Sequence, residues 1–257
     1  MCGLTGCWAP ACAREGIKHW IECMCRAIAH RGPDDEGIWC GSEHGIALGF
    51  RRLAIIDVSP AGHQPMASAT GRYVVAFNGE IYNFAALRAE FGDDVTWRGH
   101  SDTEVLLAAI ERWGLRAAIE RCSGMFAVAL WDRQEHELHL VRDRLGEKPM
   151  YYGAFGDTLL FGSELKALRA HPAWRGEIDR AALSLYLRHN YVPAPYSIYK
   201  NVRKVMPGTI ATFSSPSAEP RMTQYWSPLD VAERGVRDPL TGDDTNSISQ
   251  LKSLIQH

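Results

Sequence analysis

The spacing of apolar residues along this chain predicts both helices and strands. In two stretches, Ile17–Ala29 and Ser101–Trp113, apolar positions recur with the period of about 3.6 residues typical of a helix with one buried face. Ser101 or Asp102 would cap the second helix. Further helices are expected over residues 84–91, with Asn83 as the N-cap, and over residues 164–170 and 181–187. Short apolar runs bounded by turn residues predict strands over residues 2–8, 38–40, 46–51, 73–77, 125–131, 138–141, 151–152, 159–161 and 209–213.

The order of these elements bears on the fold class. Helices and strands alternate only loosely, and several strands look paired across short turns, as residues 125–131 and 138–141 do over Asp132–Glu137. A doubly wound parallel sheet would need regular alternation instead. The pattern therefore favours an α+β fold, in which antiparallel sheets carry helices on their outer faces.

The pattern changes after Phe213. Residues 214–247 are polar, rich in turn residues and poor in large apolar side chains, as expected of a closing segment and a linker. Apolar residues return in the last ten positions with helical spacing, at Ile248, Leu251, Leu254 and Ile255. We interpret residues 248–257 as the start of a second domain.

Composition excludes several classes of partner. The 28 basic and 30 acidic residues leave a net charge of −2, and Arg51-Arg52 is the only adjacent arginine pair, so a nucleic-acid partner is not expected. No window approaches the ~18 apolar residues of a membrane span, so a membrane partner is not expected either. Seven cysteines without a secretion signal indicate reduced thiols and a cytoplasmic protein.

Four of the seven cysteines lie close together in the sequence. Cys7, Cys12, Cys23 and Cys25 are spaced C-x4-C-x10-C-x-C, which matches no zinc-binding pattern. Cys23 and Cys25 fall within an apolar helical stretch, where cysteine usually packs as a small hydrophobic residue. We expect no metal site, and the role of these four cysteines stays open.

Cys2 is a candidate nucleophile. A small second residue allows the initiator methionine to be removed, which would leave Cys2 with a free α-amine. Such an amine titrates near pH ~7.7–8.0, so it can accept the thiol proton and return it to a leaving group. On the Met1-Cys2-Gly3 start alone, an ordinary second residue is the simpler interpretation.

Other polar motifs have ordinary explanations when they are taken singly. Arg52 at a strand edge fits a surface ion pair, and Asp102 fits a helix cap. Asn78-Gly79 is the strongest short signal for a hairpin turn. Their succession behind Cys2 is harder to explain in this way.

Together and in this order, these motifs strongly resemble the glutamine-hydrolysing domain of asparagine synthetases. That domain is a class II glutamine amidotransferase, one of the N-terminal nucleophile hydrolases. The resemblance runs from Cys2 to about Trp226. It rests on MCG at 1–3, HRGPDD at 30–35, RLAIID at 52–57, FNGEIYN at 77–83, HSDTE at 100–104, GMFAVALWD at 124–132, RDRLGEKPMYY at 142–152 and GSELKAL at 162–168.

The resemblance implies a fold and a catalytic centre. The fold would be a four-layer αββα sandwich, two antiparallel sheets flanked by helices. Cys2 would attack the side-chain amide of glutamine, with its α-amine relaying the proton. The side-chain amide of Asn78 and the backbone N–H of Gly79 would stabilise the oxyanion. We interpret His30, Arg31 and Asp34 as loop-building more than catalytic.

The resemblance also implies a binding site for the amino-acid head of glutamine. Arg52 suits the carboxylate through a bidentate pair. Asp102 suits the ammonium, with Glu80 nearby. Backbone around Leu53 and Ile55 would shape the pocket.

The family also predicts what lies outside this chain. A synthetase domain would follow, binding ATP and Mg2+ through a Ser-Gly-Gly-x-Asp-Ser loop that is not found here. We expect a glutamine amidotransferase type 2 domain over residues 2–213, a closing segment and linker over 214–247, and the start of the synthetase domain over 248–257. The domain would need no cofactor and would release ammonia for that synthetase domain to add to aspartate.

Three questions stay open at the level of sequence. The acceptor could be another carboxylate, as in related amidotransferase families. The chain could also be a non-catalytic, truncated scaffold domain, although the joint presence of Cys2, Arg52, Asn78, Gly79 and Asp102 argues against this. A homodimer is possible, but the sequence does not decide the oligomeric state.

Overall fold

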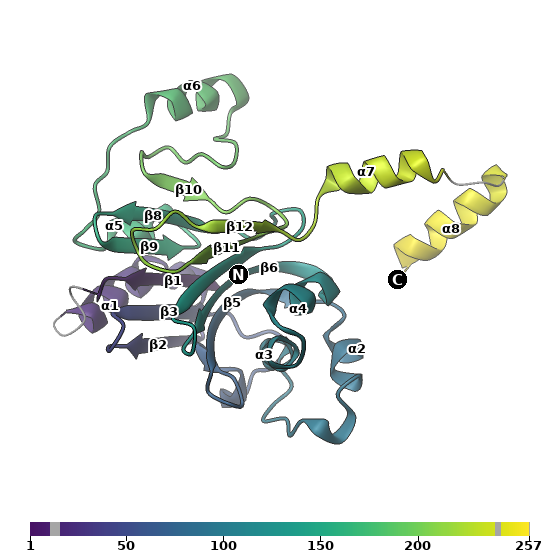
Figure 1. The fold of residues 1–257 in the computed structure, drawn as a ribbon, viewed down its shortest axis with the longest axis horizontal. Coiled ribbons are helices and arrows are strands. Elements are labelled where there is room, and N and C mark those ends of the chain that lie inside the picture. Colours follow the sequence, from purple (N-terminus) through teal and green to yellow (C-terminus); the bar gives the residue numbers. More distant parts are fainter. Residues whose placement is uncertain (11–15, 240–242, 257) are drawn as a thin grey trace. The chain divides into compact units, whose positions relative to one another are not determined.

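Two six-stranded antiparallel sheets form the centre of the computed structural model, which describes residues 1–10, 16–239 and 243–256 (Figure 1). The first sheet has the order β10 (Val202–Lys204), β8 (Tyr151–Phe155), β9 (Thr158–Gly162), β1 (Gly3–Trp8), β3 (Ile46–Arg52) and β2 (Asp35–Gly41). The second has the order β12 (Arg221–Gln224), β11 (Thr209–Phe213), β7 (Glu137–Arg142), β6 (Gly124–Asp132), β5 (Tyr73–Ile81) and β4 (Met66–Ala67).

Helices cover the outer face of each sheet. On the first sheet, α1 (Ile17–Ala27) packs against β1, β2 and β3, and α5 (Leu165–Arg169) packs beside it. On the second, α3 (Asp102–Trp113) packs against β4 and β5, with α2 (Phe84–Ala89) and α4 (Leu115–Arg121) packed on α3. Among the described residues up to Tyr225, the other helical segments are α6 (Arg180–His189) and the short 3-10 turns Ala29–Arg31, Pro60–Gly62 and Gly92–Asp94.

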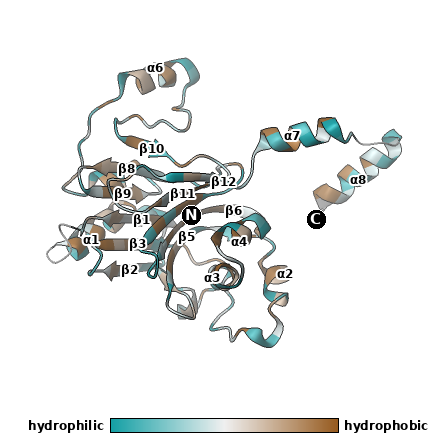
Figure 2. Cartoon of the chain, viewed as in Figure 1, coloured by the Kyte–Doolittle hydropathy of each residue, from teal (hydrophilic) through white to brown (hydrophobic). Residues whose placement is uncertain are grey.

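Buried apolar clusters hold these layers together. One fills the space between the sheets and includes Leu4, Phe50, Val74 and Trp131. Another lies between the first sheet and helices α1 and α5. Because the central strands are covered on both faces, their sequences are almost continuously apolar, as the hydropathy colouring in Figure 2 shows. The predicted α+β class with two antiparallel sheets between helices is confirmed.

The described chain forms two units, Met1–Tyr225 and Trp226–His257. The second unit holds α7 (Pro228–Arg237) and α8 (Asp244–Gln256). The Ser227 side chain caps α7 by accepting from Asp230 N–H (3.3 Å). The apolar residues predicted on one face of the last helix are all more than half exposed in α8: Ile248, Leu251, Leu254 and Ile255.

Some local predictions were wrong. Asn78-Gly79 lies inside β5 and not in a turn. The segment assigned to a linker contains strand β12 and helix α7, and β4, β10 and α4 were not predicted. Asn83 precedes α2 without capping it, because its side chain bonds to Arg121 O and Ser123 N–H instead. The functional division at residues 213 and 247 stays a prediction.

The cysteine-rich stretch was also singled out by sequence. Cys7 and Cys25 belong to the buried cluster under α1, and Cys12 lies outside the described residues. Within the described ranges, no three His, Cys, Asp or Glu side chains are placed to hold a metal ion. Over the same ranges, every helix falls short of the length or the apolar character needed to cross a bilayer.

Candidate active site

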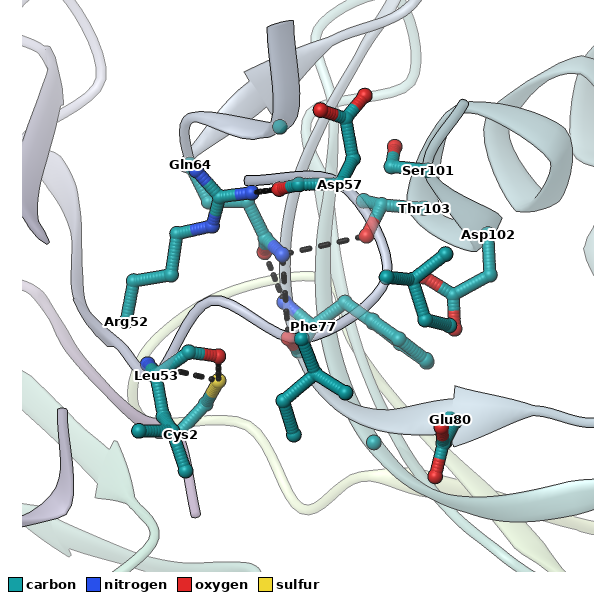
Figure 3. A pocket seen from close by; sticks show the side chains of 14 residues that line it. Cys2, Arg52, Leu53, Asp57, Gln64, Phe77, Glu80, Ser101, Asp102 and Thr103 are labelled. Carbon is teal, nitrogen blue, oxygen red and sulfur yellow. Dashed lines mark hydrogen bonds between the residues drawn. The ribbon is translucent and has the colours of Figure 1, made fainter. Parts of the chain in front are cut away.

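A pocket with about 450 Å³ of empty space, its mouth included, lies where Cys2 meets the loop after β3, the edge of β5 and the start of α3 (Figure 3). Its wall includes most of the residues predicted from sequence: Cys2, Arg52, Leu53, Ile55, Gly79, Glu80 and Asp102. The structure also adds Ile56, Asp57, Gly62, Gln64, Phe77, Ser101 and Thr103. Asn78 is not on this wall.

Cys2 immediately precedes β1 and is half-buried. Leu53 N–H donates to its sulfur (3.3 Å), and the thiol lies 3.4 Å from Leu53 O. Burial raises the pKa of the thiol, while the Leu53 hydrogen bond and the charges of the chain's terminal ammonium, Arg52 and Arg31 oppose this rise. The thiol therefore stays protonated at neutral pH and needs a base before it can act as a nucleophile.

Arg31 fixes the backbone of Cys2. Its Nε donates to Cys2 O (2.8 Å), and its Nη1 donates to Glu164 (2.9 Å). Burial would raise the pKa of Glu164, but hydrogen bonds from Arg31, Lys166 and His30 hold it at about 2. In the same loop, Asp34 accepts from Ala54 N–H (2.8 Å). These contacts agree with the structural role expected for His30, Arg31 and Asp34.

The pairing of β5 with β6 determines which backbone groups of β5 face the pocket. Tyr82 N–H donates to Ser123 O (2.7 Å), and Arg133 N–H donates to Arg72 O (2.9 Å) in the same register. Bonded and non-bonded pairs alternate along an antiparallel ladder. Even-numbered residues of β5 therefore bond to β6, and odd-numbered residues direct their N–H and C=O groups away from it.

On this outer edge of β5, Gly79 differs from the other outward-facing residues in its hydrogen bonding. The other outward-facing residues all have partners: Tyr73 with Ser68, Val75 with Met66, Phe77 with Gln64 and Ile81 with Asp102. The outward N–H of Gly79 has no hydrogen-bond partner among the described residues. A Cβ at this position would overlap with Met125 O in β6, so close packing of the two strands requires glycine here.

Asn78 presents a second donor without a partner. Strand alternation turns its side chain toward the cluster between the sheets, against which Cys2 also packs. The residue is 1% exposed, and among the described residues its Nδ2 has no hydrogen-bond partner. A buried donor in this state costs about 1–3 kcal/mol, which points to an acceptor that arrives with a ligand.

Arg52, the last residue of β3, is anchored by backbone oxygens. Its guanidinium donates to Asp57 O and to Ser59 O (3.1 Å). Gly62 makes room for it, because a Cβ there would overlap with Nη2. The Asp57 carboxylate accepts from His100 N–H (2.8 Å) and Ser59 N–H (2.9 Å). These bonds, that of His100 foremost, lower the pKa of Asp57 to about 2.

Asp102 begins α3 and is 5% exposed. The cap of this helix is Ser101, which accepts from Glu104 N–H (3.2 Å), so the Asp102 carboxylate is available to accept from Ile81 N–H (3.0 Å). Burial, with a smaller contribution from the charge of Glu80, raises the pKa of Asp102 to about 6. A carboxylate in this state gains from a bound cation.

The pocket thus combines a thiol, the Gly79 N–H that has no partner among the described residues, a guanidinium and three carboxylates. In Figure 3 Arg52 and Asp102 reach the pocket from different sides. This arrangement suits a zwitterionic amino-acid head next to an electrophilic group. The family model for the glutamine amidotransferase domain matches residues 1–226. The chain belongs to this family of enzymes.

Curated relatives of this amidotransferase are named as glutamine-hydrolysing asparagine synthetases. Asparagine synthetase 3 of Bacillus subtilis is 36% identical over 100% of this chain and 40% of its own length. Asparagine synthetase 1 of the same organism is 40% identical over 81% of this chain and 33% of its own length. A putative asparagine synthetase 2 of Methanocaldococcus jannaschii is 35% identical over 88% and 46%. The chain thus spans less than half the length of these relatives.

Solved structures support the fold of the amidotransferase. A glutamine phosphoribosylpyrophosphate amidotransferase of B. subtilis has a TM-score of 0.63 at 19% identity, covering 87% of this chain and 49% of that one. An allosteric regulatory enzyme of purine biosynthesis has a TM-score of 0.61 at 18% identity. The chain therefore shares its fold with these two solved structures.

Sequence reasoning missed three polar residues of the amidotransferase pocket. Asp57 ends the RLAIID motif, and Thr103 lies in the HSDTE motif, so both motifs were noticed without these roles. Gln64 lay in a Pro- and Gly-bearing loop and carried no signal. Its function as a hydrogen-bonding partner of Phe77 depends on where β4 stops, which the local sequence does not specify.

Proposed function

We propose that this domain hydrolyses glutamine to glutamate and ammonia at Cys2. The observation that carries the proposal is the pocket itself, where the Cys2 thiol shares a wall with the unpartnered Gly79 N–H, the anchored Arg52 and the buried Asp102. An amide hydrolase needs a nucleophile, oxyanion donors and a means of holding the rest of the substrate. Each of these needs has a candidate residue here.

The nucleophile requires removal of Met1, which is 61% exposed. In the described chain the backbone nitrogen of Cys2 belongs to the peptide bond with Met1. Removal of Met1 would convert this nitrogen to a free amine. That amine would take the thiol proton, and the thiolate would attack the side-chain amide carbon of glutamine. Collapse of the tetrahedral intermediate would break the C–N bond, and the amine would give its proton to the departing ammonia. Water would then hydrolyse the thioester, which releases glutamate and restores the thiol.

The two donors without partners are suited to the oxyanion of the tetrahedral intermediate. Within the described ranges, Asn78 Nδ2 and Gly79 N–H make no hydrogen bond that the substrate would have to break. Donors that are already in place stabilise developing charge without reorganisation at the moment of reaction. We assign these two groups to the oxyanion site.

The charged residues are suited to the amino-acid head of glutamine. Arg52 uses part of its five-donor guanidinium on Asp57 O and Ser59 O, and its remaining donors can pair with the substrate carboxylate. Asp102, with Glu80 beside it, would hold the ammonium. Leu53 and Ile55 would form the wall between the head and the reacting amide.

We further propose that the whole protein is an asparagine synthetase. The named relatives are more than twice as long as the part of them that this chain covers. In this proposal a synthetase domain beyond residue 257 binds ATP and Mg2+, receives the ammonia and amidates aspartate. A cytoplasmic location, which would keep the Cys2 thiol reduced, and a homodimer belong to the same proposal.

The release of glutamate and ammonia from glutamine tests the glutaminase part. The wild-type domain should be active, and Cys2→Ala should not. Cys23→Ala is a matched control, because Cys23 is a half-buried cysteine of α1 that does not line the pocket. Equal activity of wild type and Cys2→Ala, or loss of activity only in Cys23→Ala, would refute the assignment of the nucleophile.

A further inference from the structure

The side chain of Gln64 takes the place of a strand residue at the edge of β5. Strand β4 pairs Met66 and Ala67 with Val75 and Val74 and continues no further along β5. At the next outward-facing residue, Phe77 N–H donates to Gln64 Oε1 (2.7 Å) and Gln64 Nε2 lies 3.3 Å from Phe77 O. One side-chain amide thus satisfies both backbone groups that a neighbouring strand would otherwise satisfy.

Helix α3 helps to hold this amide in place. Gln64 Nε2 also donates to Thr103 Oγ1 (3.2 Å), and both residues are buried, at 5% and 3% exposed. The N–H and C=O of Phe77 set which way the amide faces, and the Thr103 bond ties the amide to the first turn of α3. Asp102, the neighbour of Thr103, holds Ile81 N–H (3.0 Å). The first turn of α3 therefore fixes β5 on both sides of Gly79.

We propose that Gln64, held by Thr103, is a positioning residue for the Gly79 N–H. This inference rests on the proposed function, in which that N–H stabilises the oxyanion. Gly79 lies between Phe77 and Ile81, which are held at the outer edge, while its own N–H is left without a partner among the described residues. The Gly79 N–H is only two peptide units from Phe77 and two from Ile81. The bonds that fix Phe77 and Ile81 therefore also fix the direction of this N–H.

A purely structural role for Gln64 makes a different prediction. In that case it would only satisfy the buried backbone of Phe77, and its loss would lower stability without a selective effect on catalysis. An oxyanion donor must lie about 2.7–3.1 Å from the oxyanion, so a small tilt of the Gly79 peptide weakens it in the transition state. Binding of the amino-acid head, which lies at Arg52 and Asp102, would not change.

The test compares Gln64→Ala and Thr103→Val with wild type in steady-state hydrolysis of glutamine. We expect Gln64→Ala to lower kcat about 10–100-fold, since complete loss of an oxyanion donor costs about 10²–10³ and misplacement costs less. Thr103→Val should lower kcat about 3–10-fold, because it leaves the two Phe77 bonds in place. The matched control is Thr212→Val, which removes another buried threonine hydroxyl, bonded to His139 (3.0 Å) away from the pocket.

Two ligands separate positioning from general damage. 2-Aminobutyrate has the amino-acid head but no side-chain oxygen for the oxyanion donors, so its Kd should stay within about twofold of wild type. The aldehyde analogue of glutamine adds the Cys2 thiol and forms an oxyanion-like hemithioacetal, so its Ki should rise in parallel with the fall in kcat. Melting curves establish that the compared variants are folded, and Thr103→Val carries the test if Gln64→Ala does not fold.

The outcomes are distinct. An unchanged kcat in folded Gln64→Ala and Thr103→Val, or a Kd for 2-aminobutyrate that weakens as much as kcat falls, would overturn the positioning role. Inactive wild-type protein, or an active Cys2→Ala, would instead refute the proposed function on which it rests. A fall in kcat together with a parallel rise in the aldehyde Ki and an unchanged Kd for 2-aminobutyrate would support both.

Discussion

The two ends of the pocket are built in opposite ways. At the end with the charges, Arg52 is held by two backbone oxygens, and Asp102 accepts a backbone N–H. At the end with the thiol, the Gly79 N–H has no partner in the described chain, and neither has the side-chain amide of Asn78, which is almost completely buried and lies off the pocket wall. The charged groups are anchored by the protein before a substrate arrives, and the two donors are not.

The difference reflects when each end is needed. The head of glutamine has the same charges in the ground state and in the transition state, so the residues that bind it gain from fixed positions throughout. The oxyanion exists only during reaction, and donors kept free of protein partners stabilise it without first losing a bond. The protein carries the cost of unpaired donors in the resting state.

We expect the largest effect on glutamine hydrolysis from removal of the Cys2 thiol. Cys2→Ala removes the covalent route, so glutamine hydrolysis should fall below detection while the melting temperature stays near that of wild type, because Cys2 is only half-buried. An assay of ammonia release beside a melting curve checks both halves of this prediction. Activity within tenfold of wild type would mean that the nucleophile is another residue.

Asn78→Ala should have the next largest effect. Loss of one oxyanion donor should lower kcat by about 10²–10³ and leave KM for glutamine nearly unchanged, because Asn78 does not line the wall where the head binds. Steady-state kinetics measure the two parameters separately. A rise in KM with an unchanged kcat would place Asn78 in substrate binding instead.

Changes at the charged end should have the opposite signature. Arg52→Lys and Asp102→Asn each weaken a charged hydrogen bond worth about 1.5–3 kcal/mol, so KM should rise about 10–100-fold with a smaller fall in kcat. Lysine should not restore binding, since an ammonium cannot form the bidentate pair. A glutamine analogue without the ammonium should be indifferent to Asp102→Asn.

A purely structural role for the two residues gives another result. If Arg52 formed only local bonds and Asp102 only supported α3, their variants would melt at lower temperature with KM for glutamine unchanged. Melting curves measured on the same protein samples decide between the two accounts.

The smallest expected effect is the pH dependence of stability and of glutamine affinity that Asp102 produces. Because the pKa of Asp102 is raised from 3.8 to about 6, the folded protein binds this proton more tightly than the unfolded chain between those values. The contribution of Asp102 to stability is therefore fully present below about pH 4 and is lost as pH rises through about 6. Binding of the substrate ammonium needs the ionised form, so affinity should change in the other direction.

Equilibrium binding of glutamine to Cys2→Ala measures this without turnover. Its Kd should be constant above pH 6 and rise by up to about tenfold for each pH unit below it. The double variant Cys2→Ala/Asp102→Asn should bind weakly at all pH values, with no break near pH 6. A break that persists in the double variant would assign the titration to another group.

How much could be predicted from sequence differs between the same two ends. At the charged end, the expected roles of Arg52 and Asp102 came from the family resemblance, because an arginine at the end of β3 and an aspartate in the first turn of α3 also fit a surface ion pair and a helix cap. The thiol end depends on register. Asn78-Gly79 locally predicts a turn, and only pairing with β6 places both residues in a strand with the Gly79 N–H facing outward.

The fold shows a similar division. The long apolar strands and the amphipathic helices α1 and α3 were predicted because each carries its own periodicity. The short edge strands β4, β10 and β12 were missed, since two to four residues leave no pattern and pairing with a neighbour defines them. Gln64 was missed for the same reason, as its role arises where β4 ends.

The central claim is that Cys2, freed of Met1, carries the glutamyl group during hydrolysis. Mass spectrometry of active protein, quenched in acid during turnover and then digested, tests it most directly. We predict that the N-terminal peptide begins at Cys2 and that a fraction of it carries a γ-glutamyl group as a thioester. Full activity in protein that retains Met1, or a glutamyl group found only on another residue, would contradict the account.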